Sequence, residues 1–415
     1  MATPAVHHRH RYAISKRGRL VWLGLVVAMV LVGGLAVVID RVITDSRQNS
    51  RPTLQGSIEG LVSGPGRIAP SVTAYVAGPR GVWVSSAGSA AIGTPMRPDA
   101  RLRLNSVGKT WTAALILKLV GEGRMKLDDT VSHWLPGLLP YGSKITVAQL
   151  LSMTSGMIDT NDLYAKPAYY ISEIKDPALR ARVQAAARRA RTDPTYPPTR
   201  VWIEAAAGVG LLYQPGSTWH YSNIGYMVLG LIAARAGGAD LATLFRTQII
   251  DPLHLQSTRY DPAPNLRGPH AHGYSLGAHG KLVDATGWTG GLAANGGIVS
   301  DAADEAHFLQ SLMRGQILRH AQLMALETPY AQGGLGLGNA SYGLGIVIQP
   351  DGCATPGFAY GHNGGGDGYM SSVQVSPDGG RVAVVLANGY GASSAAQDQG
   401  SATLFSAMQR LYCAR

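Results

Sequence analysis

The chain has 415 residues, of which 46% are hydrophobic and 15% are charged, so it is too apolar for a disordered protein and long enough for one large domain or two smaller ones. Its net charge is +11, but five of the basic residues lie within the first 19 positions and the rest are spread thinly. No basic stripe with interleaved aromatic residues is present, which argues against a nucleic-acid-binding protein.

Residues 20–39, LVWLGLVVAMVLVGGLAVVI, form a run of 20 residues without a charge. As a helix this run would span about 30 Å, the thickness of a bilayer core. It predicts a single transmembrane anchor in the cell membrane, with the basic tail of residues 1–19 in the cytoplasm. The alternative is a cleaved signal sequence, although no A-x-A-like site follows the run. Residues 40–55 are predicted to be a linker, and residues 56–415 a folded extracytoplasmic domain.

Strand signals occur near both ends of that domain. A hairpin is expected over 71–77 and 81–88, followed by an apolar helix of about 16 residues that begins near Trp111. Residues 144–325 are mainly helical in pattern, and strands are predicted again at 342–348, 369–375 and 381–388, before a last helix through 395–411. Strands from both ends must then meet in one sheet with a helical region inserted between them. The prediction is an α/β fold with a cleft where the two parts join.

Two further features of this domain leave alternatives open. Residues 160–200 are polar and basic, and they are interpreted as an insertion that forms a solvated surface excursion, or else a lid or substrate wall. The two cysteines, Cys353 and Cys413, are expected to form a disulfide because the domain lies outside the cytoplasm. The alternative is a pair of buried thiols.

Ser106 and Lys109 stand three residues apart in NSVGK, a polar step that opens the apolar helix. Residues at this spacing lie on one helical face, about 5–6 Å apart at Cβ. A neighbouring amine can take the proton of a serine hydroxyl if desolvation lowers the pKa of the amine, and the free N–H groups of a helix N-terminus favour negative charge. The pair predicts a nucleophile with its base, against the alternative of a capping serine. The same spacing recurs at Ser172 and Lys175, but no apolar helix follows there.

Tyr221 and Asn223 belong to YSN, which precedes the apolar run of residues 224–237. We expect both side chains to lie in the loop before that helix and to face the cleft. A tyrosine beside a lysine ammonium can have its pKa lowered enough to act as a general base. The alternative is a buried tyrosine with a capping asparagine.

Residues 361–370, GHNGGGDGYM, precede the last strands. Glycines let a substrate backbone approach closely, and His362 could act as a cation or a hydrogen-bond donor. The alternative is a glycine-rich turn without a role in chemistry.

These motifs occur in order within the stretches PDARLRLNSVGKTWTAALILKLVGEGRMKLDDTVSHWLPG, ITVAQLLSMTSGM, YSNIGYMVLGLIAARAGG, ANGGIVSDAADEAHFL and HNGGGDGYMSSVQVSPDGG. Over about residues 65–410 the chain resembles the class C β-lactamase-like serine hydrolases, which comprise AmpC-type β-lactamases, low-molecular-weight D-alanyl-D-alanine carboxypeptidases and related esterases. The resemblance implies their α/β fold, an antiparallel sheet flanked by helices with an inserted mostly α-helical region. It also implies a hydrolase that forms an acyl-serine intermediate on peptide, β-lactam or ester bonds, including those of peptidoglycan-derived peptides, without a cofactor or metal.

The resemblance assigns roles to individual residues. Ser106 resembles the acylated nucleophile, Lys109 its base partner and Tyr221 the general base for acylation and deacylation. Asn223 resembles the residue that binds the substrate amide. The backbone N–H groups of Ser106 and Gly365 would form the oxyanion hole, where each donor typically contributes ~3–4 kcal/mol to transition-state stabilisation.

The third motif departs from the family pattern. His362 and Gly364 match the first and third positions of the K/H-T/S-G motif, but many members have lysine where this chain has His362. Asn363 stands where a Thr or Ser hydroxyl usually helps to hold the substrate carboxylate. Recognition of a carboxylate is therefore in doubt, and with it β-lactamase and carboxypeptidase activity.

Three other interpretations compete with this one. The stretch GYSLG, residues 273–277, fits the G-x-S-x-G elbow of α/β-hydrolases, but its flanks predict neither the strand nor the helix that this motif needs. His270, His272 and His279 are close in sequence, but no H-E-x-x-H motif or cysteine pair supports a metal site. A non-catalytic membrane-anchored protein that captures cell-wall peptides would keep the fold without forming a covalent adduct.

Overall fold

The computed structural model of this chain describes residues 54–189, 193, 199–263, 266–277, 281–288, 293–332, 339–355, 357–366 and 368–414. The predicted tail and anchor, residues 1–39, lie outside the described residues, as does most of the linker. Within the described ranges, no single helix is long and apolar enough to cross a membrane, and only the pair Asn223–Gly237 and Leu241–Ile250, bent by 75°, reaches that length and apolarity together.

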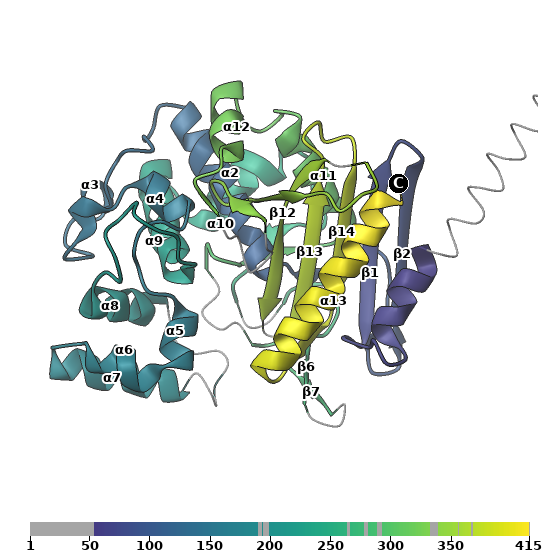
Figure 1. The fold of residues 1–415 in the computed structure, drawn as a ribbon, viewed down its shortest axis with the longest axis horizontal. Helices are drawn as coiled ribbons and strands as arrows, with labels where there is room; N and C mark the ends of the chain where they lie inside the picture. Colours follow the sequence, from purple (N-terminus) through teal and green to yellow (C-terminus); the bar gives the residue numbers. More distant parts are fainter. Residues whose placement is uncertain are drawn as a thin grey trace, which may run out of the picture. The chain divides into compact units, whose positions relative to one another are not determined.

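A nine-stranded antiparallel sheet lies at the centre of the domain (Figure 1). Its strand order is β3-β2-β1-β14-β13-β12-β11-β10-β9. The strands are β1 (Ser71–Gly78), β2 (Gly81–Ala91), β3 (Thr94–Pro95), β9 (Ala331–Gln332), β10 (Ser341–Tyr342), β11 (Val347–Pro350), β12 (Phe358–Gly366), β13 (Tyr369–Val375) and β14 (Val382–Ala387). Because β1 pairs with β14, strands from the two ends of the domain meet in one sheet, which confirms that part of the prediction.

Two small sheets complete the strand pairing among the described residues. One has the order β4-β8-β5, and the other has the order β15-β6-β7. Their strands are β4 (Leu102–Arg103), β5 (Arg259–Tyr260), β6 (Tyr274–Leu276), β7 (Leu282–Asp284), β8 (Ile298–Ser300) and β15 (Gly389–Gly391). The first of these sheets places β4 directly before the serine of the first motif.

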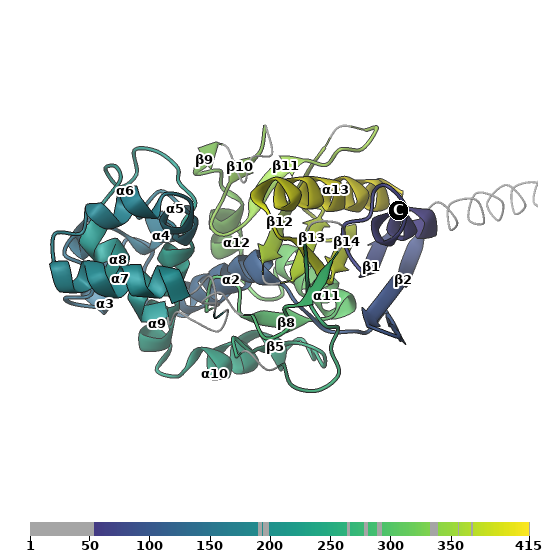
Figure 2. The same ribbon diagram turned by 90° about the horizontal axis from the view of Figure 1, so that it is seen from below.

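Two amphipathic helices cover the faces of the central sheet. Helix α11 (Ala302–Met313) packs on β14 and β1, and α13 (Ser394–Cys413) packs on β13 and β14. Figures 1 and 2 show the two helices on opposite faces of the sheet. The sheet strands β13 and β14 are buried along their whole length because both faces are covered.

The middle of the chain is mainly helical, as predicted, although β5, β6, β7 and β8 also lie there. Helices α2 (Gly108–Gly121) and α3 (Val131–Trp134) precede it, and its α-helices besides α11 are α4 (Val147–Leu151), α5 (Thr160–Ala165), α6 (Pro167–Ser172), α7 (Pro177–Arg189), α8 (Thr199–Val209), α9 (Asn223–Gly237), α10 (Leu241–Phe245) and α12 (His320–Glu327). Short turns η1 (Asn105–Val107), η2 (Gly142–Lys144) and the π-helical η3 (Arg246–Ile250) complete the set. The insertion of residues 160–200 thus contains α5, α6 and α7, and most of its proline-rich end lies outside the described residues.

Helix α2 joins the helical region to the sheet layer. It is buried on nearly every side and packs on α9 and α12. Trp111 on α2 stacks on Phe308 of α11 with ring centroids 3.7 Å apart, and its indole Nε1 donates a 2.9 Å hydrogen bond to Glu305. One hydrophobic core therefore runs through both parts of the domain and fixes the start of α2 between them.

The predicted strand over residues 342–348 is two short strands, β10 and β11, with a bend between them. Gly345 causes the bend, because its φ is +80° and an added Cβ would lie 2.5 Å from Ala113 and 2.7 Å from the hydroxyl of Tyr226. Its carbonyl also accepts a hydrogen bond from Thr110 at the start of α2. The chain therefore leaves the sheet at this point to pack against α2.

A disulfide joins Cys353, after β11, to Cys413 at the end of α13. The two Cα atoms are 5.3 Å apart, and 60 residues separate the cysteines in sequence. The last helix is thus fixed to the loop that follows β11.

Candidate active site

Ser106 lies in η1, the single turn between β4 and α2. The preceding residue, Asn105, has a φ of +50°, a left-handed conformation that asparagine tolerates better than most residues. The Asn105 Nδ2 group donates hydrogen bonds of 2.9 Å to the carbonyl of Gly366 and 3.1 Å to that of Tyr369. Ser106 is partly exposed and does not cap α2, whose N-cap position is Val107 without a side-chain bond. The capping alternative for this serine is therefore wrong.

The amine of Lys109 is buried and surrounded by oxygen atoms. Its Nζ lies 3.0 Å from Ser106 Oγ, 2.7 Å from Asn223 Oδ1 and 2.9 Å from the backbone carbonyl oxygen of Asn295. The side chain of Lys109 has no exposed surface. The spacing of the first motif thus brings serine and lysine together as expected, and the lysine also bonds to two other segments of the chain.

Burial lowers the pKa of Lys109 to about 7, and the carboxylate of Asp159 opposes this shift. Burial disfavours the charged ammonium, because a position in the protein interior has a lower dielectric constant than bulk solvent. A lysine with this pKa is about half deprotonated at neutral pH, so its free amine can accept the proton of Ser106.

Tyr221 lies directly before the N-cap of α9, next to both members of the first motif. The Ser106 side chain acts to lower the pKa of the Tyr221 phenol, and Lys109 Nζ lies 4.8 Å from the centroid of its ring. Burial raises the pKa of Tyr221 well above its ordinary value of 10. The expectation that the lysine ammonium lowers the pKa of this phenol is therefore wrong, because desolvation of the phenolate outweighs attraction to the neighbouring charge.

Asn223 is the first residue of α9, not a loop residue as expected. Ser222 caps this helix, because its Oγ accepts a hydrogen bond from Gly225 N and donates one to the carbonyl of Ile158. The N–H of Asn223 donates to Asp159 Oδ1 at 2.7 Å, and its carboxamide oxygen accepts from Lys109. The helix N-terminus therefore presents Asn223 toward the lysine.

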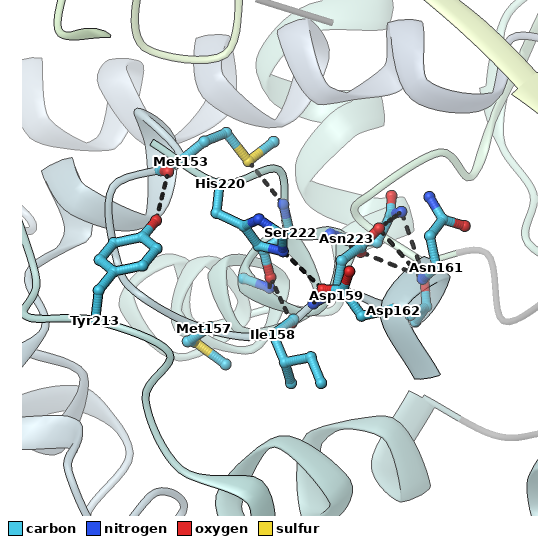
Figure 3. Close-up of polar contacts among 12 residues, drawn as sticks. Met153, Met157, Ile158, Asp159, Asn161, Asp162, Tyr213, His220, Ser222 and Asn223 are labelled. Atoms are coloured by element: carbon cyan, nitrogen blue, oxygen red, sulfur yellow. Dashed lines mark hydrogen bonds and ion pairs between the residues drawn. The ribbon is translucent and has the colours of Figure 1, made fainter. Parts of the chain in front are cut away.

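A network of hydrogen bonds holds the residues around YSN in place (Figure 3). His220 Nε2 lies 2.6 Å from Asp162 Oδ2, and that hydrogen bond raises the pKa of His220. Met153 accepts hydrogen bonds at its carbonyl from His220 N and at its sulfur from Ser222 N. Asp159 and Asp162 form a reciprocal capping box at the start of α5. The network fixes both residues that flank Tyr221.

His362 lies within β12, so the third motif is part of a strand and does not form the turn that was the alternative. Its side chain is 2% exposed. Its Nδ1 lies 2.6 Å from the carbonyl of Asn363, and its Nε2 lies 3.1 Å from the hydroxyl of Tyr342. Burial, with a further contribution from the charge of Lys109, lowers the pKa of His362 to about 3. His362 is therefore neutral at physiological pH, and the expectation of a cation at this position is wrong.

The end of β12 runs close to the nucleophile. A Cβ added at Gly364 would lie 2.2 Å from the carbonyl oxygen of Leu104 and 3.1 Å from Ser106 N, so only glycine fits there. The next residue, Gly365, is exposed. Asn363 pairs with Ser372 on β13, whose hydroxyl donates to Asn363 Oδ1 at 2.8 Å. The strand thus runs beside the backbone of Ser106 at Gly364, the residue before Gly365.

The competing motifs do not form comparable sites. Ser172 ends α6 and donates to the carbonyl of Tyr169, and Lys175 is exposed. Ser275 lies in the middle of β6, which continues into the hairpin with β7, so the strand–turn–helix elbow is absent at this serine. His279 lies outside the described residues. Within the described part of the chain, no group of three or more His, Cys, Asp or Glu side chains could hold a metal ion.

Sequence reasoning missed two groups of this site, Asp159 and the carbonyl of Asn295. The D-x-x-D spacing of Asp159 and Asp162 is a helix N-cap signal that could have placed Asp159 at the start of a helix. Nothing in the sequence indicates that this helix start lies beside YSN, because 64 residues separate Asp159 from Asn223. The backbone carbonyl of Asn295 carries no sequence signal.

The sequence profile of the Beta-lactamase family matches residues 58–405. The chain belongs to the beta-lactamase family. Within this family it is 25% identical over 309 residues to Penicillin-binding protein 4* of Bacillus subtilis (strain 168), a match that covers 71% of this chain and 62% of that protein.

Two solved structures share the fold of this beta-lactamase-family chain. A D-stereospecific amidohydrolase from Streptomyces sp. is 27% identical, with a TM-score of 0.67 over 84% of this chain and 97% of that one. The D-amino acid amidase from Ochrobactrum anthropi SV3, complexed with L-phenylalanine amide, is 22% identical, with a TM-score of 0.71 over 88% and 98% of the two chains. The second likeness concerns the fold alone.

Proposed function

We propose that this beta-lactamase-family hydrolase cleaves amide, peptide or ester bonds through an acyl enzyme on Ser106. The observation that carries the proposal is the 3.0 Å contact between Ser106 Oγ and Lys109 Nζ, together with the lowering of the Lys109 pKa to about 7. A nucleophile within hydrogen-bond reach of a base that is half deprotonated at neutral pH meets the two requirements of nucleophilic catalysis.

Acylation begins with transfer of the Ser106 proton to the neutral amine of Lys109. Ser106 Oγ then bonds to the substrate carbonyl carbon, and the N–H groups of Ser106 and Gly365 stabilise the oxyanion. The Tyr221 hydroxyl, kept protonated by its raised pKa, donates its proton to the leaving nitrogen or oxygen. The bond to the leaving group breaks, and Tyr221 recovers a proton from the Lys109 ammonium.

Deacylation follows the reverse order with water in place of the leaving group. Lys109 is again a free amine, so it accepts a proton from the attacking water through the Tyr221 hydroxyl. Collapse of the second tetrahedral intermediate breaks the acyl–Oγ bond, and Ser106 recovers its proton. In this scheme Lys109 is the base and Tyr221 is a proton relay, which differs from the role of general base that the family resemblance assigned to Tyr221.

The third motif favours substrates without a required carboxylate. His362 is neutral and its two ring nitrogens are both occupied, and Asn363 offers only a neutral amide. A neutral amide hydrogen bond to a carboxylate is weaker than one from a cation. We therefore propose that simple amides and esters are hydrolysed better than β-lactams or peptides ending in D-Ala-D-Ala. The likeness to the D-stereospecific amidohydrolase from Streptomyces sp., at 27% identity, supports the same preference.

The test is to incubate the protein with a β-lactam, a D-Ala-D-Ala peptide, a D-amino acid amide and a short-chain ester. Adduct mass and turnover are followed for each compound. Ser106→Ala should abolish the covalent adduct, whereas Ser172→Ala and Ser275→Ala, the two other candidate serines, should leave it intact. A protein that binds these compounds without any adduct would be the non-catalytic binder, and an adduct that depends on Ser275 would refute the assignment.

We also propose that the chain is exported and anchored in the cell membrane by residues 20–39, with the hydrolase domain outside. The charge-free run and its basic flank support this. The full chain should partition with membranes, and a chain that starts near Thr53 should not. A mature exported form beginning just after residue 39 would refute the anchor and identify a signal sequence.

A further inference from the structure

We propose that Asp159 is a positioning residue of this reaction, which orients Asn223 toward Lys109 and stabilises the proton that Lys109 takes from Ser106. The inference rests on the proposed function. Asp159 itself contacts neither the nucleophile nor the position of the substrate carbonyl. It acts on the reaction through Asn223 and Lys109.

The first argument is the direction of the Asn223 carboxamide. Asp159 Oδ1 accepts from Asn223 N at 2.7 Å, and Asp159 Oδ2 accepts from Asn223 Nδ2 at 3.4 Å. A carboxylate accepts hydrogen bonds only, so it selects the NH₂ end of the amide. The oxygen end is then left for Lys109, whose Nζ donates to it at 2.7 Å. Two longer contacts favour the same orientation, from Asn223 Nδ2 to Thr160 Oγ1 at 3.4 Å and from Asn295 Nδ2 to Asn223 Oδ1 at 3.5 Å, but among the described residues the carboxylate is the only charged group that selects it.

The second argument is burial without a direct counter-ion. Asp159 is 3% exposed, and its hydrogen-bond partners are backbone N–H groups, the Asn223 amide and the Thr160 hydroxyl. Lys109 is fully buried, and its three hydrogen-bond partners are also uncharged. The Asp159 carboxylate and the Lys109 ammonium therefore compensate each other's charge, although the Asn223 side chain lies between them. Burial raises the pKa of Asp159, while the Asn223 N–H and the charge of Lys109 oppose that shift.

No other carboxylate acts on Lys109 among the described residues. The titratable groups that face it are Tyr221 before α9, Tyr226 on α9 at 5.6 Å from Nζ to ring centroid, and His362 on β12, with Tyr342 on β10 next to His362. Burial keeps the three phenols protonated by raising each pKa, and it keeps His362 neutral by lowering its pKa. Asp159 is thus the charged group that acts on the pKa of Lys109 in this part of the chain.

Two effects follow for catalysis. The Asp159 charge stabilises the ammonium that forms when the free amine of Lys109 takes the Ser106 proton, so it strengthens Lys109 as a base. It also raises the pH at which the free amine becomes available. Removing the charge should therefore leave a weaker base that is deprotonated at lower pH.

The test measures the rate of Ser106 labelling by a fluorescent fluorophosphonate from pH 5 to 9 on the full chain. In wild type the labelling rate should rise with pH, with the midpoint of the rise near pH 7, and then reach a plateau. This rise is the limb of the pH–rate profile. Asp159→Asn should move this limb down by about one pH unit or more and lower the plateau by about tenfold or more. Asp159→Glu keeps the charge and should retain the wild-type limb. Only the folded molecules in a sample react with the probe. A partly folded preparation therefore gives less labelling but the same midpoint of the limb.

Asp301→Asn is the matched control. Asp301 caps α11, is 5% exposed and accepts hydrogen bonds from two backbone N–H groups, so its loss weakens a buried cap without affecting Lys109. This variant should lower the melting temperature and leave the limb unmoved. If Asp159→Asn behaves in the same way, Asp159 is only structural and the inference fails. If wild type is not labelled, or if Ser106→Ala is still labelled, the proposed function itself fails.

Discussion

The Nδ2 group of Asn105 donates a 2.9 Å hydrogen bond to the carbonyl of Gly366, which connects the residue before the nucleophile to the last residue of β12. Ser106 follows Asn105, and Gly365 precedes Gly366. One side chain therefore fixes the distance between the two backbone N–H groups that would form the oxyanion hole. The left-handed φ of +50° at Asn105 is the conformation in which the side chain reaches across.

Asn105→Ala should lower kcat by roughly 10²-fold, because a small misplacement of oxyanion donors has effects of that size. Alanine also adopts a positive φ unfavourably, at a cost of about 1–2 kcal/mol of stability. Asn105→Gly removes the amide without that backbone cost, so it separates the two effects. It should lose a similar factor in kcat, and its melting temperature should fall less than that of Asn105→Ala. Wild-type kcat for Asn105→Gly on a short-chain ester would show that the tie to Gly366 is dispensable.

Tyr221→Phe removes the phenol oxygen and keeps the ring packing against Trp219, whose centroid is 6.4 Å away. Turnover should fall by about 10²–10⁴-fold, because the phenol can no longer donate a proton to the leaving group or relay one from the attacking water. The melting temperature should change little. Steady-state kinetics with an amide substrate and thermal unfolding measure the two quantities. An active Tyr221→Phe enzyme would remove this residue from the proton pathway.

His362→Lys combined with Asn363→Thr should shift specificity toward carboxylate-bearing substrates. Wild-type His362 is neutral between pH 6 and 9 because its pKa is lowered to about 3, so no alkaline decrease in carboxylate binding should arise from it. The double variant adds a cation and a hydroxyl, and the ratio of kcat/KM for a β-lactam to that for a neutral ester should rise about tenfold. The ratio is measured at several pH values. An unchanged ratio would mean that the third motif does not select the substrate's charge.

Glu305→Gln should remove a pH dependence of stability. Burial raises the pKa of Glu305 well above 4.5, although its hydrogen bond from Trp111 opposes the shift. Because the folded state keeps the proton while the unfolded state loses it above about pH 4.5, the native state is stabilised at low pH, and this contribution is lost as pH rises toward the folded pKa. One group changes the free energy of unfolding by about 1.4 kcal/mol per pH unit in that range. Urea unfolding of both proteins from pH 5 to 8 measures the slope, and equal slopes would mean that Glu305 is ionised in the fold.

The first motif could be predicted because its geometry is local. The spacing of Ser106 and Lys109 along one helical start brings their side chains together whatever surrounds them, and the hairpin of residues 71–88 and the strand of residues 369–375 follow from short-range patterns as well. The strand that contains His362 could not be recognised in this way. Its glycines have low strand propensity, and it forms because β11 and β13 pair with it on both sides.

Charge states were the least predictable part of the site. The pKa values of Tyr221 and His362 shift in directions that depend on burial, and burial is produced by segments far apart in the chain. Asp159 was missed for the same reason, since its partner Asn223 follows 64 residues later. A sequence pattern can place a functional group on an element, but the desolvation of that group depends on the completed fold.

The pairing of β1 with β14 also determines when this protein can fold. Ser71 N donates to Asn388 Oδ1 at 2.6 Å across 317 residues of sequence. At a synthesis rate of about 5–20 residues per second, β1 is made roughly 15–60 s before its partner. During that time the β1–β2 hairpin exposes a free edge, which is a template for intermolecular strand pairing. The emerging chain therefore needs protection from aggregation until β14 has been synthesised.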